Sequence, residues 1–302
     1  MRIVIALSGE ALGDDGEAIE PGVQRSRLEF IGRTLAPLVA AHEVAICHGN
    51  RPEVGVLAAE SATNLTLTEP YPLDALVAQT QGMIGYWLAQ MLVNAGVDKP
   101  VLAVVTQTVV DASDPAFRRP TTFIGPARGS NRAHDLAIRH GWMIALDGLR
   151  WRRVVASPAP VRIVERDAIE KLLDDGVTVI CAGGGGSAVT EDASGHLTGV
   201  EVVVDETDVA ALLATAVHAD RLLVLTDETG TGTGAPGGTP LPYLPGDDAR
   251  VARVPDPRMR ARIRACQRFV ESTGAQAAIG ALSEVDGLLS GSAGTTIAAH
   301  HP

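Results

Sequence analysis

Four glycine-bearing turns hold the residues of this chain that are best placed to do chemistry. Each turn follows a short apolar run of the kind that forms a buried strand. Such a turn exposes backbone N–H groups, and a helix that begins there adds its positive N-terminal end. Together they predict a site for a phosphorylated or other small anionic ligand. The turns are Ser8–Glu10, His48–Arg51, Gly183–Gly186 and Thr226–Gly230.

The basic residues are unusual in kind, because Lys99 and Lys171 are the only lysines and all the others are arginines. A reaction that depends on a lysine ammonium therefore has two candidates. Arginine can instead grip phosphate or carboxylate oxygens with two parallel N–H donors. Arg51, which directly follows a glycine turn, is suited to contact an anionic group in this way.

The composition limits the class of protein. The chain has 302 residues, which is enough for one large α/β domain or two lobes. Apolar residues make up 46% and aromatic residues 3%, so the core must consist of Val, Leu, Ile and Ala. Such a core is typical of parallel strands that helices cover on both faces. The net charge of −11 argues against nucleic acid or an anionic membrane as a partner.

Several features indicate a cytoplasmic protein. No apolar run reaches the roughly 18 residues that are needed to span a bilayer. The apolar start, residues 1–7, is too short for a secretion signal and is expected to form a first strand. Cys47, Cys181 and Cys266 are odd in number and far apart in sequence, which favours buried free thiols over a metal site.

Strands and helices are expected to alternate, which predicts right-handed crossovers and a mainly parallel sheet. The long helix over 73–93 contains Gly82 and Gly85. A glycine inside a helix costs about 1 kcal/mol relative to alanine, so we expect close packing against another backbone there. The predicted helices cover 21–41, 73–93, 165–175 and 257–273, and predicted strands cover 43–47, 101–106, 177–181 and 222–225.

Two segments break this alternation. Residues 111–160 are rich in proline, arginine and tryptophan, and we interpret them as an inserted excursion or lid subdomain. Residues 228–246 contain glycines, prolines and threonines with almost no charge. This composition predicts a long loop or hairpin, and long loops in compact domains often have a function.

A series of motifs runs in order through nearly the whole chain. They are Ala6–Leu12, His48–Gly55, Pro72–Asp74, Gln81–Tyr86, Thr106–Asp111, Asp114–Phe117, Pro120–Thr121, Ile124–Pro126, Arg153–Pro158, Arg162–Glu165, Gly183–Gly186 and Leu225–Asp227. Together these motifs resemble the carbamate kinases, which belong to the amino acid kinase family. The resemblance implies an α/β fold, a three-layer αβα sandwich around a mainly parallel sheet, with a protruding subdomain.

The resemblance also implies how the chain is organised. A single domain over 1–302 would form a homodimer. Its N-terminal lobe, about 1–175, would hold the phosphate acceptor and carry the protruding subdomain at about 111–160. Its C-terminal lobe, about 176–302, would hold ATP.

The chain departs from the family pattern at positions that carry the chemistry. The family's first turn reads Gly-Gly-Asn, whereas here it is Ser8-Gly9-Glu10. Its second turn reads His-Gly-Asn-Gly-Pro-Gln, whereas here Arg51 and Glu53 replace the second glycine and the glutamine. Three family lysines are also missing, and the residues at the matching positions are Thr122, Glu206 and Arg262.

Replacement of lysine by glutamate has a large electrostatic effect. Two unit charges about 4 Å apart interact by roughly 4 kcal/mol at an effective dielectric constant of about 20. Since phosphoryl transfer depends on positioning and charge neutralisation, Glu10 and Glu206 are expected to slow it unless other groups compensate. Carboxylates could hold Mg²⁺, and arginines could bind phosphate. The candidate arginines are Arg51, Arg128, Arg162 and Arg262.

These considerations assign roles to the candidate site residues. The predicted catalytic or charge-supplying residues are Glu10, Arg51, Glu206 and Arg262. The predicted substrate contacts are Ser8, Gly9, Gly49 and Asn50. The predicted cofactor contacts are Gly183, Gly184, Gly185, Asp205, Thr226 and Asp227. Asp205 and Asp227 are also consistent with structural caps, and no metal-ligand cluster emerges.

The leading hypothesis is an ATP-dependent phosphotransferase of the carbamate kinase type with altered chemistry or an altered acceptor. It would use ATP/ADP with Mg²⁺ and a carbamate, small carboxylate or carbamoyl phosphate substrate. One alternative is a catalytically dead or repurposed protein that binds a small anion on the same fold. The other is a non-kinase enzyme of carbamoyl or carboxylate chemistry in which Glu10 or Glu206 acts as an acid or base.

Overall fold

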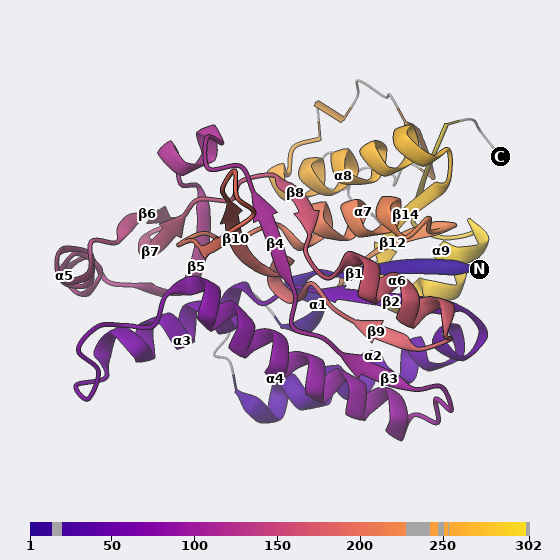
Figure 1. The fold of residues 1–302 in the computed structure, drawn as a ribbon, viewed down its shortest axis with the longest axis horizontal. Helices are drawn as coiled ribbons and strands as arrows, with labels where there is room; N and C mark the ends of the chain where they lie inside the picture. Colours follow the sequence, from indigo (N-terminus) through magenta and orange to yellow (C-terminus); the bar gives the residue numbers. More distant parts are fainter. Residues whose placement is uncertain (14–19, 228–241, 247–250, 253, 300–302) are drawn as a thin grey trace.

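The structure, a computed structural model, describes residues 1–13, 20–227, 242–246, 251–252 and 254–299. Its centre is an eight-stranded sheet in the order β13-β15-β14-β12-β1-β2-β9-β3 (Figure 1). Neighbouring strands are parallel except β14 and β15, so the sheet is mainly parallel, as predicted. Its strands are β1 Arg2–Leu7, β2 Glu43–His48, β3 Val101–Ala103, β9 Thr178–Ile180, β12 Arg221–Thr226, β13 Tyr243–Pro245, β14 Gln276–Ala281 and β15 Thr295–Ala298.

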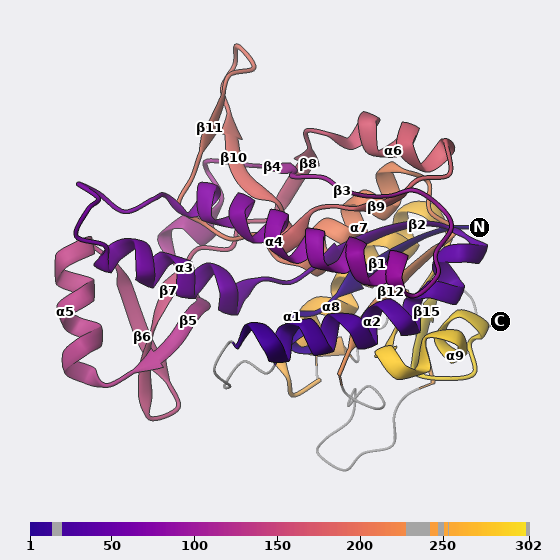
Figure 2. The ribbon, with the colours of Figure 1, turned by 90° about the horizontal axis from the view of Figure 1, so that it is seen from below.

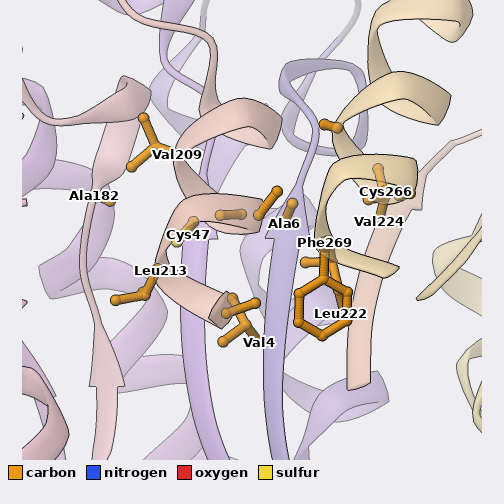
Figure 3. Close-up of a cluster of buried hydrophobic side chains, with 14 of the residues drawn as sticks. Val4, Ala6, Cys47, Ala182, Val209, Leu213, Leu222, Val224, Cys266 and Phe269 are labelled. Atoms are coloured by element: carbon orange, nitrogen blue, oxygen red, sulfur yellow. The ribbon is translucent and has the colours of Figure 1, made fainter. Parts of the chain in front are cut away.

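Helices cover both faces of this sheet. Alternate side chains of β1 point to opposite faces, with Val4 and Ala6 on one face and Ile3 and Ile5 on the other. The face of Val4 packs against α6, α7 and α8, and the face of Ile3 packs against α2, α4 and α9. Figure 3 shows residues of α7 and α8 beside Val4 and Ala6. This arrangement is the predicted three-layer αβα sandwich. These helices are α2 Pro21–Ala41, α4 Leu73–Asn94, α6 Arg166–Asp174, α7 Glu206–Ala216, α8 Pro257–Thr273 and α9 Val285–Ser290.

Further helical segments lie at the ends of the strands and in the connections. They are α1 Gly9–Leu12, α3 Arg51–Thr63, α5 Ser130–His140, η1 Pro115–Arg118, η2 Gly183–Gly185 and η4 Leu282–Glu284. Cys47, Cys181 and Cys266 are buried free thiols, as predicted. Among the described residues, no helix combines the length and the apolar character that crossing a membrane requires.

A second part of the chain projects from the sandwich (Figures 1 and 2). It contains a four-stranded sheet in the order β11-β10-β4-β8 and a three-stranded antiparallel sheet in the order β5-β7-β6. We call residues 122–155, which form the three-stranded sheet and α5, the antiparallel subdomain. It lies within the predicted excursion over 111–160. These strands are β4 Gln107–Val110, β5 Thr122–Arg128, β6 Met143–Asp147, β7 Arg150–Val155, β8 Pro160–Ile163, β10 Ser187–Glu191 and β11 Leu197–Gly199.

Two predicted segments differ from the observed elements. The strand predicted over 101–106 ends at Ala103, because the Thr106 N–H donates to the Gln81 side chain (3.0 Å) instead of continuing the sheet. Of the loop or hairpin predicted over 228–246, residues 228–241 lie outside the described residues. The end of that segment forms β13 at one edge of the large sheet.

Helical glycines mark where backbones approach closely. In α4, a Cβ at Gly85 would lie 2.9 Å from the Ala103 Cβ, so close approach to β3 accounts for this glycine. A Cβ at Gly82 would meet no atom within 4 Å, so the prediction of close packing is wrong there. In α3, a Cβ at Gly55 would lie 1.9 Å from the backbone N of Gly125. Direct backbone contact at Gly55 therefore attaches β5 of the antiparallel subdomain to α3.

Alanine at two of these glycines should have opposite effects on stability. We expect Gly55→Ala to lower the free energy of unfolding by about 1–3 kcal/mol or more, because the new methyl group forces α3 and β5 apart. Gly82→Ala, which is the matched helical control, should raise it by up to about 1 kcal/mol because no atom obstructs the methyl group. Urea unfolding measures both changes, and equal effects of the two substitutions would contradict the assigned contact.

Candidate functional site

The four predicted turns start at the same edge of the large sheet, because β12, β1, β2 and β9 are adjacent and parallel. The first two turns touch through their backbones, since a Cβ at Gly49 would lie 2.6 Å from the Gly9 N. Ser8 is buried, and its hydroxyl accepts a hydrogen bond from the Ala11 N–H (3.3 Å) at the start of α1. The residues predicted to contact substrate therefore form one tightly packed stretch of backbone.

The glycine run packs against the second turn. Gly183, Gly184 and Gly185 form η2 and are buried. A Cβ added at Gly183 would lie 2.5 Å from the His48 ring. A Cβ added at Gly184 would lie 2.1 Å from the Asn50 amide group. At Gly185 it would collide with the backbone that precedes α7. These contacts with other protein groups are thus sufficient to explain why all three positions are glycine. That the three residues also contact phosphate stays a prediction.

Buried polar side chains connect these turns, and the sequence reasoning missed most of them. The Gln81 side-chain oxygen accepts from the N–H and the hydroxyl of Thr106 (3.0 Å each), and its amide donates to the Thr106 carbonyl oxygen (3.1 Å). The Asn50 amide donates to the Thr80 hydroxyl (2.6 Å). Burial lowers the pKa of His48 to about 4, so this ring is neutral at pH 7. The second turn is therefore held rigidly from inside the protein.

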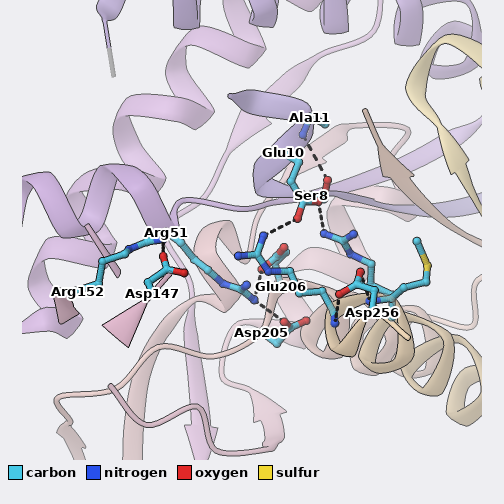
Figure 4. Close-up of polar contacts among 12 residues, drawn as sticks. Ser8, Glu10, Ala11, Arg51, Asp147, Arg152, Asp205, Glu206 and Asp256 are labelled. Atoms are coloured by element: carbon cyan, nitrogen blue, oxygen red, sulfur yellow. Dashed lines mark hydrogen bonds and ion pairs between the residues drawn. The ribbon is translucent and has the colours of Figure 1, made fainter. Parts of the chain in front are cut away.

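A cavity of about 380 Å³, which we call the charged cavity, collects the charged residues that the sequence singled out (Figure 4). Three of the four predicted catalytic residues line it, namely Arg51, Glu206 and Arg262. The fourth, Glu10, contacts Arg262. The complete lining is Arg51, Thr121, Thr122, Phe123, Ser157, Asp205, Glu206, Asp208, Pro257, Arg258, Ala261 and Arg262.

Arg51 pairs with the two acidic residues at the start of α7. Its guanidinium lies 2.5 Å from Asp205 Oδ2 and 3.4 Å from Glu206 Oε2. Asp205 is also the N-cap of α7, because its other carboxylate oxygen accepts from the backbone N–H groups of Thr207 (2.9 Å) and Asp208 (3.3 Å). The predicted role of Asp205 as a cap is therefore confirmed, and its predicted contact with a cofactor stays a prediction.

Glu10 forms a second cluster with the first turns of α8. It pairs with Arg258 (3.1 Å) and with Arg262, and its own side chain is 19% exposed. Asp256 caps α8 by accepting from the backbone N–H groups of Arg258 and Met259 (3.0 Å each). Because Arg258 and Arg262 are four residues apart, they lie on one face of the helix. The sequence reasoning missed Arg258, although this spacing was a usable signal.

Burial and pairing shift the pKa values of the carboxylates in different directions. Burial, the largest effect, raises the pKa of Glu10, but Arg262 and Arg258 together outweigh it, so the pKa is lowered overall. Burial is also the largest effect on Asp205, and Arg51 together with the backbone N–H groups of Thr207 and Asp208 holds its pKa below the usual value. For Glu206 burial dominates over Arg51, and its pKa is raised. Glu206 can therefore take up a proton inside the charged cavity, which is the property of an acid–base group.

Other candidate residues lie elsewhere. Thr226 and Asp227, at the end of β12, line a different cavity of about 590 Å³. Arg162 pairs with Glu191 (2.7 Å), and Arg128 lies on β5 outside the lining of the charged cavity. The structure thus brings together the predicted catalytic residues but not all of the predicted cofactor contacts and arginines.

The described part of the chain holds no cluster of three or more His, Cys, Asp or Glu side chains that could bind a metal ion. A Mg²⁺ ion at the charged cavity would therefore depend on oxygens from a phosphate-bearing ligand and from water. This is how Mg²⁺ is commonly held at phosphoryl-transfer sites.

Comparison with known proteins points to one family. The model of the amino acid kinase family matches residues 1–280. A carbamate kinase from Rhizobium meliloti is 40% identical over 98% of this chain and 93% of its own length, and one from Escherichia coli K12 is 41% identical over 98% of both. A carbamate kinase from Giardia lamblia bound to AMP-PNP superimposes with a TM-score of 0.87 at 29% identity, covering 98% of both chains. The similarity therefore extends over both the sequence and the fold.

Asp208, which lines the charged cavity, allows a test of the electrostatics by pH. Burial and the neighbouring Asp205 raise its pKa to about 6 against the opposing charge of Arg268. The native state therefore holds this proton more tightly than the unfolded chain does. Consequently the contribution of Asp208 to the free energy of unfolding falls as the pH rises from about 4 to about 6. We expect Asp208→Asn to raise the Tm at pH 7, and this gain should shrink towards pH 4.

Thermal unfolding followed by circular dichroism at several pH values measures the difference between the variant and the parent protein. Asp98→Asn, which removes an exposed carboxylate, is the control and should show no such trend. A gain in Tm that is the same at pH 4 and pH 7 would rule out the assigned titration of Asp208.

Proposed function

The chain belongs to the amino acid kinase family, and on that premise we propose that it is a carbamate kinase-like phosphotransferase with a rearranged set of charges. The reaction would transfer a phosphoryl group between carbamoyl phosphate, or a related acyl phosphate, and ADP. The P–O bond to the acyl oxygen breaks, a P–O bond to the terminal phosphate of ADP forms, and carbamate and ATP are released.

Four of the residues that depart from the family pattern contact one another in two pairs, and this observation carries the proposal. Arg51 replaces a glycine and Glu206 replaces a lysine, and their side chains lie 3.4 Å apart. Glu10 replaces an asparagine and Arg262 replaces a lysine, and these two also form an ion pair. In each of these two pairs the new carboxylate is matched by an arginine, and the pair carries one positive charge fewer than the family residues it replaces. Paired replacement supports a site whose cations have moved to new positions beside the new carboxylates.

An adenine nucleotide is the expected phosphoryl carrier, because a relative with the same fold binds AMP-PNP. Arg51, Arg258 and Arg262 line the charged cavity and have the donor geometry for phosphate oxygens. The nucleotide would supply the phosphoryl acceptor or donor, and Mg²⁺ would neutralise part of its charge. Since all three arginines are paired with carboxylates, binding requires an exchange of partners.

Glu10 and Glu206 would control this exchange. A phosphate oxygen that binds the Arg262 guanidinium would lie beside the Glu10 carboxylate that pairs with the same group, so Glu10 competes with the ligand. Ionised Glu206 would repel an anion in the charged cavity, whereas protonated Glu206 could donate a hydrogen bond to it. Because burial raises the pKa of Glu206, protonation is favoured there more than at an exposed glutamate.

The same ion pairs favour a second candidate function, a protein that binds a small anion without turnover. Phosphoryl transfer requires cations positioned on the charge that develops in the transition state. In this structure Arg51 and Arg262 are held by carboxylates instead. A ligand would then stabilise the protein, but no product would form.

A coupled assay separates the two functions. With carbamoyl phosphate, ADP and Mg²⁺ we expect formation of ATP, detected by luciferase luminescence. Calorimetry with AMP-PNP measures nucleotide binding independently of turnover. Binding without ATP formation would favour the anion-binding protein. Absence of both binding and turnover, with carbamoyl phosphate and with acetyl phosphate, would refute the phosphotransferase.

Reversal of one pair tests whether the two departing residues compensate each other. Glu206→Lys alone places an ammonium group beside Arg51, so we expect a lower Tm. Adding Arg51→Gly removes the repulsion and restores the family pattern at both positions, so the Tm should recover and ATP formation should rise. A double-mutant cycle should give a coupling energy of about 0.5–3 kcal/mol.

The exposed pair of Glu29 and Arg33 on α2 (3.1 Å) is the matched control for this cycle. Glu29→Lys with Arg33→Gly should give a coupling energy of less than about 0.5 kcal/mol, because solvent screens the pair. If the effects of Glu206→Lys and Arg51→Gly are simply additive, the two residues do not compensate each other.

The expected homodimer and cytoplasmic location stay predictions. Leu102 on the edge strand β3 and Val105 just after it are 44% and 50% exposed, so an apolar surface is available at that edge. A second copy of the chain would cover such a surface. Light scattering in solution measures the mass, and a monomer at all concentrations would exclude the dimer.

A further inference from the structure

A second cavity, of about 540 Å³, lies between the antiparallel subdomain and the main body, and we call it the subdomain cavity. Its walls come from the end of α5, from β7, from the loop before α4 and from residues 200–202. Much of the wall is apolar and includes Phe117, Val155 and Val202. Its volume is in the range of about 300–1,000 Å³ that is typical of small-molecule sites.

Two charged side chains, Arg153 of β7 and Glu201, line this cavity, and Arg153 is the more deeply buried of them. It is 14% exposed, and its guanidinium lies over the Trp142 ring at 4.4 Å from the centroid. It also donates to Glu201 Oε2 (3.0 Å). Glu201 is 55% exposed and accepts from the Leu73 N–H (2.8 Å) through its other oxygen, so it lies at the mouth of the cavity. The bond to Glu201 uses one of the five N–H donors of the guanidinium.

These groups define the chemistry of a ligand. The planar guanidinium matches a carboxylate, because two parallel N–H donors fit its two oxygens. A phosphate has further oxygens to satisfy, and the apolar part of the wall, which includes Phe117, Val155 and Val202, offers them no donors. An aromatic or branched hydrocarbon group fits the apolar walls and the Trp142 ring. We propose that the subdomain cavity binds a small carboxylate with an aromatic or branched apolar side chain, and that its carboxylate binds Arg153.

The subdomain cavity shares two chain segments with the charged cavity. Val155 and Ala156 line the subdomain cavity, and the next residue, Ser157, lines the charged cavity. Likewise, Pro120 lines the subdomain cavity and the next residue, Thr121, lines the charged cavity. A ligand of the subdomain cavity therefore contacts segments that also shape the candidate active site. Its binding does not depend on the proposed phosphotransferase activity.

Calorimetry on the full chain with three probes that share a phenyl ring tests the ligand class. Phenylacetate carries the carboxylate alone, phenylalanine carries both charges, and phenethylamine carries the ammonium alone. We expect saturable binding of phenylacetate and phenylalanine and none of phenethylamine. Tighter binding of phenylalanine would identify amino acids as the ligands, and tighter binding of phenylacetate would identify simple acids. Binding of phenethylamine as tight as that of phenylacetate, or no saturable binding of any probe, would overturn the proposal.

Two variants tie the binding to this cavity. Arg153→Met should weaken phenylacetate binding about tenfold or more. The matched control, Arg150→Met, changes an exposed arginine of the same strand and should leave the affinity unchanged. Val200→Phe adds bulk from the cavity wall and should abolish binding while Arg153 is retained. Thermal unfolding verifies that each variant is folded. Unchanged phenylacetate affinity in a folded Arg153→Met or Val200→Phe variant would disprove the assignment.

Discussion

Charge compensation between the two halves of the chain is the constraint on which the rest of the site depends. Glu206 is almost fully buried, and a buried charge that loses its partner costs about 3–5 kcal/mol. An ionised glutamate at this position therefore requires a cation beside it, and Arg51 supplies that cation. Glu10 and Arg262 obey the same rule. The departures from the family pattern are thus coupled changes, and neither member of a pair can be understood alone.

The two ion-pair clusters also link distant parts of the chain. Arg51 and Asp205 are 154 positions apart, and Glu10 and Arg262 are 252 positions apart. Each pair joins a turn at the sheet edge to the start of α7 or α8. An anion that enters the charged cavity would compete with these carboxylates for the arginines, so ligand binding would weaken one connection while forming another. Binding and the relative position of these elements are therefore expected to be coupled.

Packing around the turns gives this electrostatic arrangement a rigid base. Gly49 lies against the backbone of Gly9, and Gly184 lies against the Asn50 side chain. The Asn50 amide is in turn bonded to Thr80. Because these contacts leave no room for a Cβ, the turns cannot shift without disturbing their neighbours. Charged side chains can exchange partners, whereas the backbone that carries them stays in place.

Much of the fold could be predicted from the sequence because it rests on local patterns. Apolar periodicity located helices 21–41 and 257–273, which are α2 and α8. Apolar runs that stop at glycine turns located β1, β2, β9 and β12. The same local patterns failed where a distant side chain decided the outcome. Thr106 leaves the strand because it bonds to Gln81, 25 positions away, and nothing near residue 106 indicates this.

The candidate site shows the same division. Residue types and the order of the motifs were sufficient to single out Arg51, Glu206 and Arg262, which line one cavity. Only the tertiary structure decided that Arg51 neutralises Glu206, that Glu10 neutralises Arg262, and that Arg258 joins the second pair. The physical reason is that Coulomb energy depends on distance in space. The fold brings these charges together from positions that are remote along the chain.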